Sequence, residues 1–197
     1  MIVHDPFAEP AIFPTAYEAI MRDTLALGFD KSSEALTGAL LRTLAASKPG
    51  GKLLEIGTGT GIGSCWLLDG MDAHSQLITV ERDEQVNTIA QRHLGGDARV
   101  QFVTADAGEW LKTLAPQQFD LIFADTFPGK FFQLEDALNA LKIGGLYVID
   151  DLLPQPTWLD NHQPAVEQLI QILDQRSDLV VTKLHWASGI MICTKRN

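Results

Sequence analysis

The chain has 197 residues, 46% of them hydrophobic, which is enough to bury one substantial core but short for two. We therefore expect a single domain over residues 1–197. The formal net charge of −10 opposes binding to phosphate backbones and to anionic lipid surfaces, because such binding depends on Lys and Arg contacts. Nucleic acid and membranes are thus excluded as expected partners.

The two cysteines, Cys65 and Cys193, lie in apolar segments far apart in the sequence. A disulfide framework needs more cysteines at closer spacing, so both are expected to be buried thiols, as in a reducing compartment. The first residues lack the basic and apolar regions of a signal peptide, and no apolar run approaches the roughly 18 residues that span a bilayer. The sequence therefore predicts a cytoplasmic protein.

Two stretches near the N-terminus, Pro14–Leu27 and Ser33–Ala46, carry apolar residues at helical spacing. They predict two packed helices, which form a helical cap at one end of the sheet within residues 1–50. From residue 51 onward, short apolar runs alternate with helix-length amphipathic stretches, a pattern typical of a parallel sheet. The predicted strands are Lys52–Ile56, Gln76–Val80, Val100–Val103, Asp120–Ala124, Gly145–Ile149, Val180–Leu184 and Ile190–Thr194. The predicted helices among them are Ile62–Met71, Glu84–Leu94, Gly108–Leu114, Phe131–Leu141 and Pro164–Gln175.

The last two predicted strands are separated only by Trp186–Gly189, so they should form an antiparallel hairpin at the sheet edge. The sequence thus predicts an α/β fold. Its core, residues 51–197, is a Rossmann-like, seven-stranded, mostly parallel sheet with an antiparallel C-terminal edge strand and helices on both faces.

A glycine-rich loop, Glu55–Gly63, follows the first predicted strand and leads into a helix. Glycines there let the backbone approach a ligand, and the exposed N–H groups of the helix start carry partial positive charge. The alternative is that these glycines only make a tight turn. Every register of the dinucleotide pattern G-x-G-x-x-G fails, because Ile62, Ser64 and Trp66 occupy the third glycine position. The spacing instead favours an amino-acid nucleoside, with Glu55 near its amino group.

Two further acids end the next strands. Glu81 stands where a carboxylate accepts both ribose hydroxyls of a bound nucleoside, or else it caps the helix that begins near Glu84. Asp106, beside the small residue Ala107, is a candidate acceptor for an adenine amino group or, equally, a helix N-cap.

With these residues assembled, the chain resembles class I S-adenosylmethionine-dependent methyltransferases, and within them the small O-methyltransferases of the catechol and caffeoyl-CoA type. The resemblance rests on Leu54–Gly61, Val80–Glu81, Phe119–Asp125 and Leu141–Asp151. It implies that the methionine end of the cofactor lies over the glycine loop, the ribose at Glu81 and the adenine near Asp106. The cofactor-binding positions implied in this way are Glu55, Gly57, Thr58, Gly59, Gly61, Glu81, Asp106, Ala107 and Asp125.

In metal-dependent members of this group, an Asp ends the fourth strand and an Asp-Asn pair ends the fifth. The matching positions, Asp125, Asp150 and Asp151, imply a site for Mg²⁺ or another divalent cation, which would lower the pKa of a bound hydroxyl. Asp151 departs from the family because it replaces the Asn. The alternative is that the three acids line the cofactor cleft without a metal.

The catalytic Lys of the family stands about three residues after the fourth-strand Asp, whereas here Lys130 comes five residues after Asp125. Asp125 and Lys130 are therefore the candidate catalytic residues, with Pro128-Gly129 as the turn that would bring Lys130 inward. Lys130 could instead be a solvated lysine at a helix start, or could simply neutralise Asp125.

The expected acceptor pocket follows the strand ends and includes Phe127, Tyr147, Trp158 and the segment Leu152–Thr157. His162 is either a proton acceptor there or an unremarkable loop histidine.

The resemblance implies methyl transfer to a hydroxyl of a small-molecule acceptor. Related enzymes are often dimers, so the apolar faces of the two N-terminal helices are candidate homodimer surfaces.

Three other functions stay open. The first is aminopropyl transfer with a decarboxylated cofactor, disfavoured because no N-terminal β domain precedes Ser33. The second is a non-catalytic cofactor-binding module, and the third is an NAD-linked oxidoreductase, disfavoured by the failed fingerprint.

Overall fold

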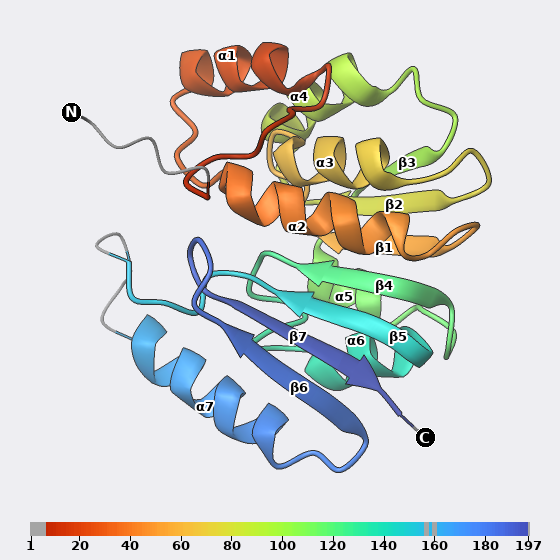
Figure 1. Cartoon of the computed structure of the whole chain (residues 1–197), viewed down its shortest axis with the longest axis vertical. Helices are drawn as coiled ribbons and strands as arrows, with labels where there is room; N and C mark the ends of the chain where they lie inside the picture. The colour runs from red at the N-terminus through yellow and green to blue at the C-terminus, as the bar shows by residue number, and fades with distance from the viewer. Residues whose placement is uncertain (1–6, 156–157, 159–160, 197) are drawn as a thin grey trace.

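A seven-stranded sheet runs through the centre of the molecule, with helices on both of its faces (Figure 1). The computed structural model describes residues 7–155, 158 and 161–196. The strands are β1 (Lys52–Ile56), β2 (Gln76–Glu81), β3 (Val100–Thr104), β4 (Phe119–Ala124), β5 (Leu141–Ile149), β6 (Leu179–Leu184) and β7 (Ile190–Lys195). The helices are α1 (Tyr17–Leu27), α2 (Ala35–Ala46), α3 (Ile62–Gly70), α4 (Glu84–Leu94), α5 (Ala107–Leu111), α6 (Leu134–Ala140) and α7 (His162–Asp174).

The strand order β3-β2-β1-β4-β5-β7-β6 confirms the predicted Rossmann-like sheet. The pairs from β3 to β5 are all parallel, and β7 runs antiparallel to both of its neighbours, β5 and β6. The predicted C-terminal hairpin is therefore present. Its second strand, β7, is inserted beside β5, so β6 rather than β7 is the outermost strand.

The predicted and observed bounds of the elements differ by only a few residues, and two of these shifts lie on either side of α6. The helix begins at Leu134, not at Phe131, because Gly129 and Gln133 both have positive φ, of 84° and 48°, and hold the preceding residues in a loop. At the other end, β5 starts at Leu141 directly after the helix.

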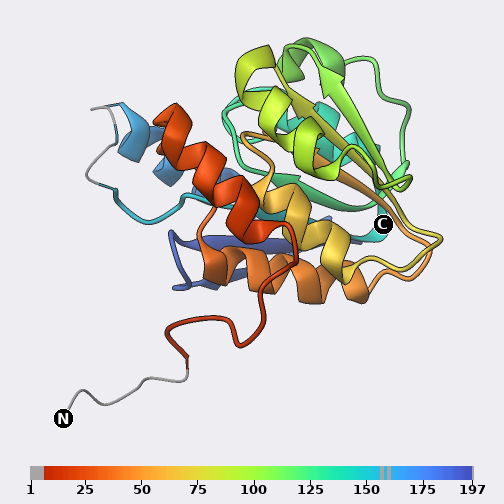
Figure 2. The ribbon, with the colours of Figure 1, turned by 90° about the horizontal axis from the view of Figure 1, so that it is seen from above.

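Alternate residues of the buried strands supply the cores on the two sheet faces. Leu54 and Ile56 belong to the core that α5, α6 and α7 cover, whereas Leu53 points to the core that α1 to α4 cover. Helix α2 lies beside α3 (Figure 2), and a Cβ on Gly38 would stand 2.2 Å from Cδ1 of Trp66. The two N-terminal helices therefore pack over one face of the sheet, and not at one end of it as predicted. The segment joining them reaches the carboxyl ends of the strands.

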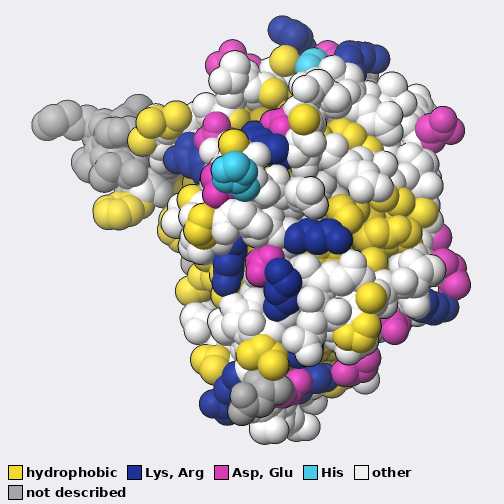
Figure 3. Space-filling model, turned by 90° about the vertical axis from the view of Figure 1, so that its right-hand side faces the viewer, with side chains coloured by type: hydrophobic (Ala, Val, Ile, Leu, Met, Phe, Trp, Pro, Cys, Tyr) yellow, Lys and Arg dark blue, Asp and Glu magenta, His cyan; other side chains and the backbone are white. Residues whose placement is uncertain are grey.

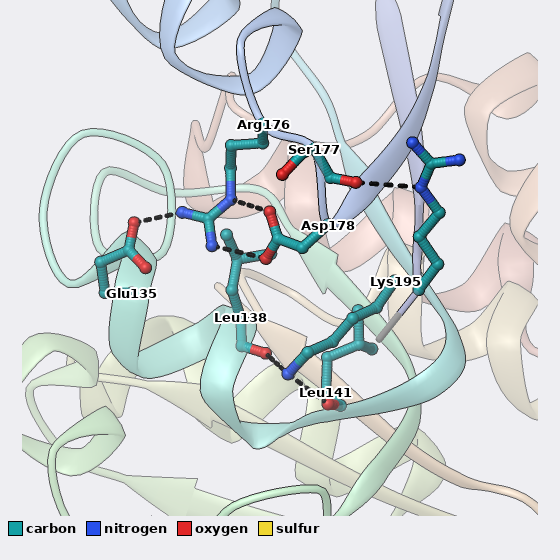
Figure 4. A network of polar contacts seen from close by, with 8 residues as sticks. Glu135, Leu138, Leu141, Arg176, Ser177, Asp178 and Lys195 are labelled. Atoms are coloured by element: carbon teal, nitrogen blue, oxygen red, sulfur yellow. Dashed lines mark hydrogen bonds and ion pairs between the residues drawn. The ribbon is translucent and has the colours of Figure 1, made fainter.

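A polar network fastens the last elements to the rest of the sheet (Figure 4). Arg176, just after α7, donates two hydrogen bonds to Asp178, at 3.0 and 2.8 Å, and one to Glu135 of α6. Lys195 at the end of β7 donates to the carbonyl oxygens of Leu138 and Leu141, at 2.7 and 3.0 Å. These contacts hold the C-terminal hairpin and α7 against α6 and β5.

The carboxyl ends of β4 and β5 point to the left in Figure 1, away from the face drawn in Figure 3. That face carries interspersed Lys, Arg, Asp and Glu side chains around a patch of hydrophobic ones.

Cys65 and Cys193 are free and buried, as expected. Within the described part of the chain, no helix is both long and apolar enough to cross a bilayer.

Candidate active site

A cleft of about 590 Å³ opens at the carboxyl ends of the parallel strands. A second cavity of about 250 Å³ lies directly over the glycine loop and shares part of the lining of the cleft, including Gly57, Glu81 and Asp125. The linker between α1 and α2, residues 30–34, contributes to the wall of the cleft. The two cavities therefore form one site with a nucleoside-sized arm over the loop and a wider arm beyond Asp125.

Three glycines give the loop a conformation that L side chains rarely adopt. Gly57, Gly59 and Gly61 have φ values of 101°, 53° and 97°. A Cβ on Gly61 would also stand 2.8 Å from the Cβ of Ala90, so α4 packs directly on the loop. The amides of Gly57 and Thr58 both donate to the carbonyl oxygen of Val80, at 3.0 and 3.1 Å, and fix the loop to the end of β2.

Glu55 lies beneath the glycine loop rather than in the cleft. Its side chain is fully buried, and neither cavity is lined by it. Oε2 accepts hydrogen bonds from the hydroxyls of Ser64 and of Thr79, the latter at 2.6 Å, while Oε1 has no partner in the described residues. Burial raises the pKa of this carboxyl to about 7. Any effect of Glu55 on a cofactor is therefore indirect, through the loop, and a contact with its amino group stays a prediction.

Glu81 borders both cavities at the end of β2. Its Oε2 accepts from the amide of Gly59 at 3.0 Å and its Oε1 from the amide of Asp83, also at 3.0 Å. Asp83 itself caps α4, since its side chain accepts from the amides of residues 85 and 86. Glu81 is thus not the helix cap and presents its carboxylate beside the loop.

Asp106 combines the two roles that the sequence left open. Its Oδ1 accepts from the amide of Glu109 at 3.0 Å, so it is the N-cap of α5. It also lines the cleft together with Ala107. Binding of an adenine there stays a prediction.

Asp125 and Asp150 are neighbours at the ends of β4 and β5. The amide of Asp150 donates to the carbonyl of Ala124, the last residue of β4, at 3.3 Å. Oδ2 of Asp125 accepts from Ser33 at 2.9 Å, and Oδ1 of Asp150 accepts from Ser188 at 2.5 Å. Burial and the charge of Asp150 raise the pKa of Asp125 well above its usual value, and burial raises the pKa of Asp150 to about 6.

The side chain of Lys130 points toward Asp125 and Asp150. Only 3% of its side chain is exposed, and Nζ donates to the backbone carbonyl of Asp150 at 3.0 Å. Lys130 therefore reaches the strand-end acids although it comes later in the loop than in the family pattern, and its pairing with Asp125 stays a prediction. The sequence did not indicate a role for the two serines that bond these acids. Ser33 is 92 positions from Asp125 in the sequence, and Ser188 is 38 positions from Asp150.

The side chains of Asp125, Asp150 and Asp151 are not grouped as the ligands of a metal ion, and metal binding there stays a prediction. Within residues 7–155, 158 and 161–196, no group of three His, Cys, Asp or Glu side chains could hold an ion. One oxygen of Asp150 is taken by Ser188 and by the amide of Asp151, at 2.7 Å, and the nearest cation is the buried ammonium of Lys130. Asp151 has a φ of 61°, a conformation that Asp and Asn tolerate better than most residues.

Aromatic side chains form the wall of the wider arm. Phe127 is 47% exposed and lies edge-on to His162, with ring centroids 5.5 Å apart. His162 stacks on Trp158 at 4.2 Å, and its Nε2 is buried without a partner among the described residues. Burial and the charge of Lys130 lower the pKa of His162. The sequence left open whether His162 is a proton acceptor or an unremarkable loop histidine. Its place in the wall depends on its contacts with Phe127 and Trp158.

Tyr147 does not belong to this wall. It is fully buried within β5, and its hydroxyl donates to the carbonyl of Gly129 at 2.5 Å. The prediction that it lines the acceptor pocket is wrong, because the alternation of β5 turns its ring to the core that α6 and α7 cover. Two residues of the predicted pocket segment, Pro156 and Thr157, lie outside the described residues.

The strand order, the glycine loop and the acids at the strand ends together define a class I S-adenosylmethionine-dependent methyltransferase. Comparison with known proteins agrees with this class. Residues 54–152 match the profile of the methyltransferase domain family, and the chain belongs to that family.

Similar proteins support the same grouping. A Mycobacterium ulcerans protein named "Putative O-methyltransferase" is 26% identical over 168 residues, covering 80% of this chain and 75% of that protein. Proteins of the same name from Mycolicibacterium smegmatis and Mycobacterium marinum are 32% and 31% identical, and the matches span 56% and 52% of their lengths.

Solved structures show the same fold. The O-methyltransferase TomG from Streptomyces achromogenes, in complex with S-adenosylmethionine, superposes with a TM-score of 0.80 at 24% identity, over 93% of this chain and 90% of that chain. The O-methyltransferase from Bacillus cereus, in complex with S-adenosylhomocysteine, gives a TM-score of 0.81 at 20% identity, over 94% of this chain and 93% of that chain.

Proposed function

We propose that this protein transfers the methyl group of S-adenosylmethionine to a hydroxyl oxygen of a small organic acceptor. The observation that carries the proposal is the continuity of the cleft. One arm lies over the glycine loop and Glu81, and the other holds Asp125, Lys130 and an aromatic wall. Its volume of about 590 Å³ lies in the range of small-molecule sites.

The residues of the first arm, and those where it joins the larger cavity, suit the parts of the cofactor in order. The methionine portion would lie over Gly57–Gly61, where the glycines present no side chain, and the ribose hydroxyls would donate to Glu81. The exocyclic amino group of adenine would donate to Asp106, which lines the larger cavity beside Ala107. This arrangement directs the sulfonium methyl toward Asp125 and the second arm.

The residues of the second arm suit an acceptor hydroxyl. Asp125 takes the hydroxyl proton while the oxygen attacks the methyl carbon of the sulfonium. The carbon–sulfur bond breaks with its electron pair staying on sulfur, which leaves S-adenosylhomocysteine and the methyl ether. The ammonium of Lys130 stabilises the negative charge that develops on the oxygen. Holding both reactants in one cleft supplies most of the rate enhancement.

Release of S-adenosylhomocysteine in the presence of acceptor panels tests this proposal. Matched acceptors that differ only in a hydroxyl, amino or thiol group should give turnover with the hydroxyl member. Turnover confined to amines or thiols would overturn the oxygen assignment. Transfer of an aminopropyl group from the decarboxylated cofactor, with no methyl transfer, would favour the alternative enzyme class.

A further inference from the structure

We propose that the ammonium of Lys130 takes the place of a divalent cation in this cleft, so that the reaction needs no metal. The proposal rests on the proposed function for the reaction itself, but its central statement concerns what the strand-end acids hold. Three features of the structure support it: the position of Lys130, the hydrogen bonds that the acids already accept, and the conformation of the loop that carries Lys130.

The first feature is the position of the ammonium. Lys130 is 3% exposed, and its Nζ lies 3.0 Å from the carbonyl oxygen of Asp150, at the edge where Asp125 and Asp150 end adjacent strands. The positive charge of Lys130 acts on both carboxyls, since it opposes the rise that burial causes in the pKa of each. A buried cation therefore already lies beside the acids that a metal ion would have to bind.

The second feature is the state of the carboxylates. Asp150 accepts hydrogen bonds from Ser188 and from the amide of Asp151 on a single oxygen, and Asp125 accepts from Ser33. Mg²⁺ requires a nearly ideal octahedron of oxygens, and an ion here would have to compete with the hydrogen bonds that these carboxylates already accept. The donor set thus fits an ammonium better than a divalent ion.

The third feature is the loop that carries Lys130. The hydroxyl of Tyr147 donates to the carbonyl of Gly129, and a Cβ on Gly129 would stand 2.8 Å from Cδ1 of Ile56. Gly129, with a φ of 84°, therefore sits against the core and forces the next residue to turn inward. Tyr147 is thus a positioning residue for Lys130, which explains why a lysine further along the loop than in related enzymes still reaches the acids.

Metal binding can be measured without any acceptor. We would titrate Mn²⁺ into the wild-type chain, with and without S-adenosylmethionine, and follow the paramagnetic resonance signal of the free ion. The signal should match that of buffer alone. The proposal would be overturned if the wild type reduced the signal stoichiometrically and the Asp125→Asn variant did not. This outcome needs no known acceptor, so it is separable from failure of the proposed function.

Turnover then tests the role of the charge. With an accepted substrate, EDTA should change the rate less than twofold, whereas Lys130→Met should lower kcat at least about 100-fold, as for loss of an oxyanion-stabilising group. Lys183→Met, which removes an exposed lysine of β6, is the matched control and should leave kcat unchanged. Loss of activity on chelation, or full activity of Lys130→Met, would contradict the proposal.

A double-mutant cycle separates positioning by Tyr147 from a general structural role. Tyr147→Phe removes only the hydroxyl and should lower kcat about tenfold while the Kd for S-adenosylmethionine is unchanged. Combined with Lys130→Met, it should cause no further loss, because the two residues act through one group. Additive losses would show that Tyr147 does not act through Lys130.

Discussion

Oε1 of Glu55 lies 2.2 Å from the point at which a Cβ on Gly63 would stand. The first turn of α3 therefore passes directly over a buried carboxyl, and packing requires a glycine at this position. The same carboxyl bonds Thr79, which is itself 2.6 Å from the hydroxyl of Thr58 in the loop. Glu55 thus links the floor of the loop to β2 and α3.

Replacing Gly63 should disturb the packing of α3 on the carboxyl of Glu55. We expect Gly63→Ala to lower the free energy of unfolding by about 1–3 kcal/mol, as overpacking in a core does, and to weaken S-adenosylmethionine binding. Gly96→Ala is the matched control, because nothing lies within 4 Å of its added Cβ, and its effect should stay within about 0.5 kcal/mol. Denaturant unfolding measures both variants. A Gly63→Ala chain as stable as the control would contradict the packing argument.

The buried carboxyl of Glu55 should make stability depend on pH. Its pKa is about 7 in the folded chain against an ordinary value of 4.5. Below pH 4.5 both states hold the proton, and between these values the unfolded chain releases it while the folded chain keeps it. Stability is therefore lost as pH rises through this window, by roughly 3 kcal/mol in total.

Glu55→Gln removes the titration and keeps an oxygen that can accept from Ser64 and Thr79. The free energy of unfolding of the wild type, minus that of the variant, should fall between pH 4.5 and 7 and level off above. Unfolding curves at several pH values give this difference. A difference that does not vary with pH would mean that Glu55 titrates normally.

Glu81 should be needed for cofactor affinity. Without its carboxylate the ribose hydroxyls lose a charged acceptor, worth about 1.5–3 kcal/mol, so Glu81→Ala should bind S-adenosylmethionine roughly 10- to 150-fold more weakly. Glu84→Ala removes an exposed acid from the first turn of α4 and is the control. Equal affinities for the two variants in calorimetry would remove Glu81 from the cofactor site.

Phe127 should affect the acceptor and not the cofactor. Its ring is 47% exposed in the cleft wall, so Phe127→Ala should raise the KM for an aromatic or apolar acceptor about tenfold and leave the Kd for S-adenosylmethionine unchanged. Ile143→Ala, which truncates an exposed side chain near the start of β5, should change neither constant. A parallel rise in both constants would place Phe127 at the cofactor instead.

The elements and the cofactor loop could be predicted because their signals are local. A strand such as Phe119–Ala124 is recognised from its own apolar residues and from the helical patterns on either side of it. The glycine spacing from Gly57 to Gly61 is likewise read from neighbouring residues. The order of the strands was not predicted, and the structure shows that β7 lies between β5 and β6.

The reacting half of the cleft could not be predicted in the same way, because long-range contacts decide it. The bond from Ser33 to Asp125, the stacking of His162 on Trp158 and the bond between Tyr147 and Gly129 join segments whose relative placement exists only in the folded chain. For the same reason the sequence allowed a metal at Asp125, Asp150 and Asp151. The hydrogen bond from Lys130 to the carbonyl of Asp150 is visible only in the folded structure.

The most direct test of the central claim is a calorimetric titration of the chain with S-adenosylmethionine, its decarboxylated form and NAD. We predict one S-adenosylmethionine per chain with a Kd in the micromolar range, weaker binding of the decarboxylated form and no heat with NAD. Absence of S-adenosylmethionine binding up to millimolar concentration, or tighter binding of either competitor, would contradict the assignment of the glycine loop and of the whole site.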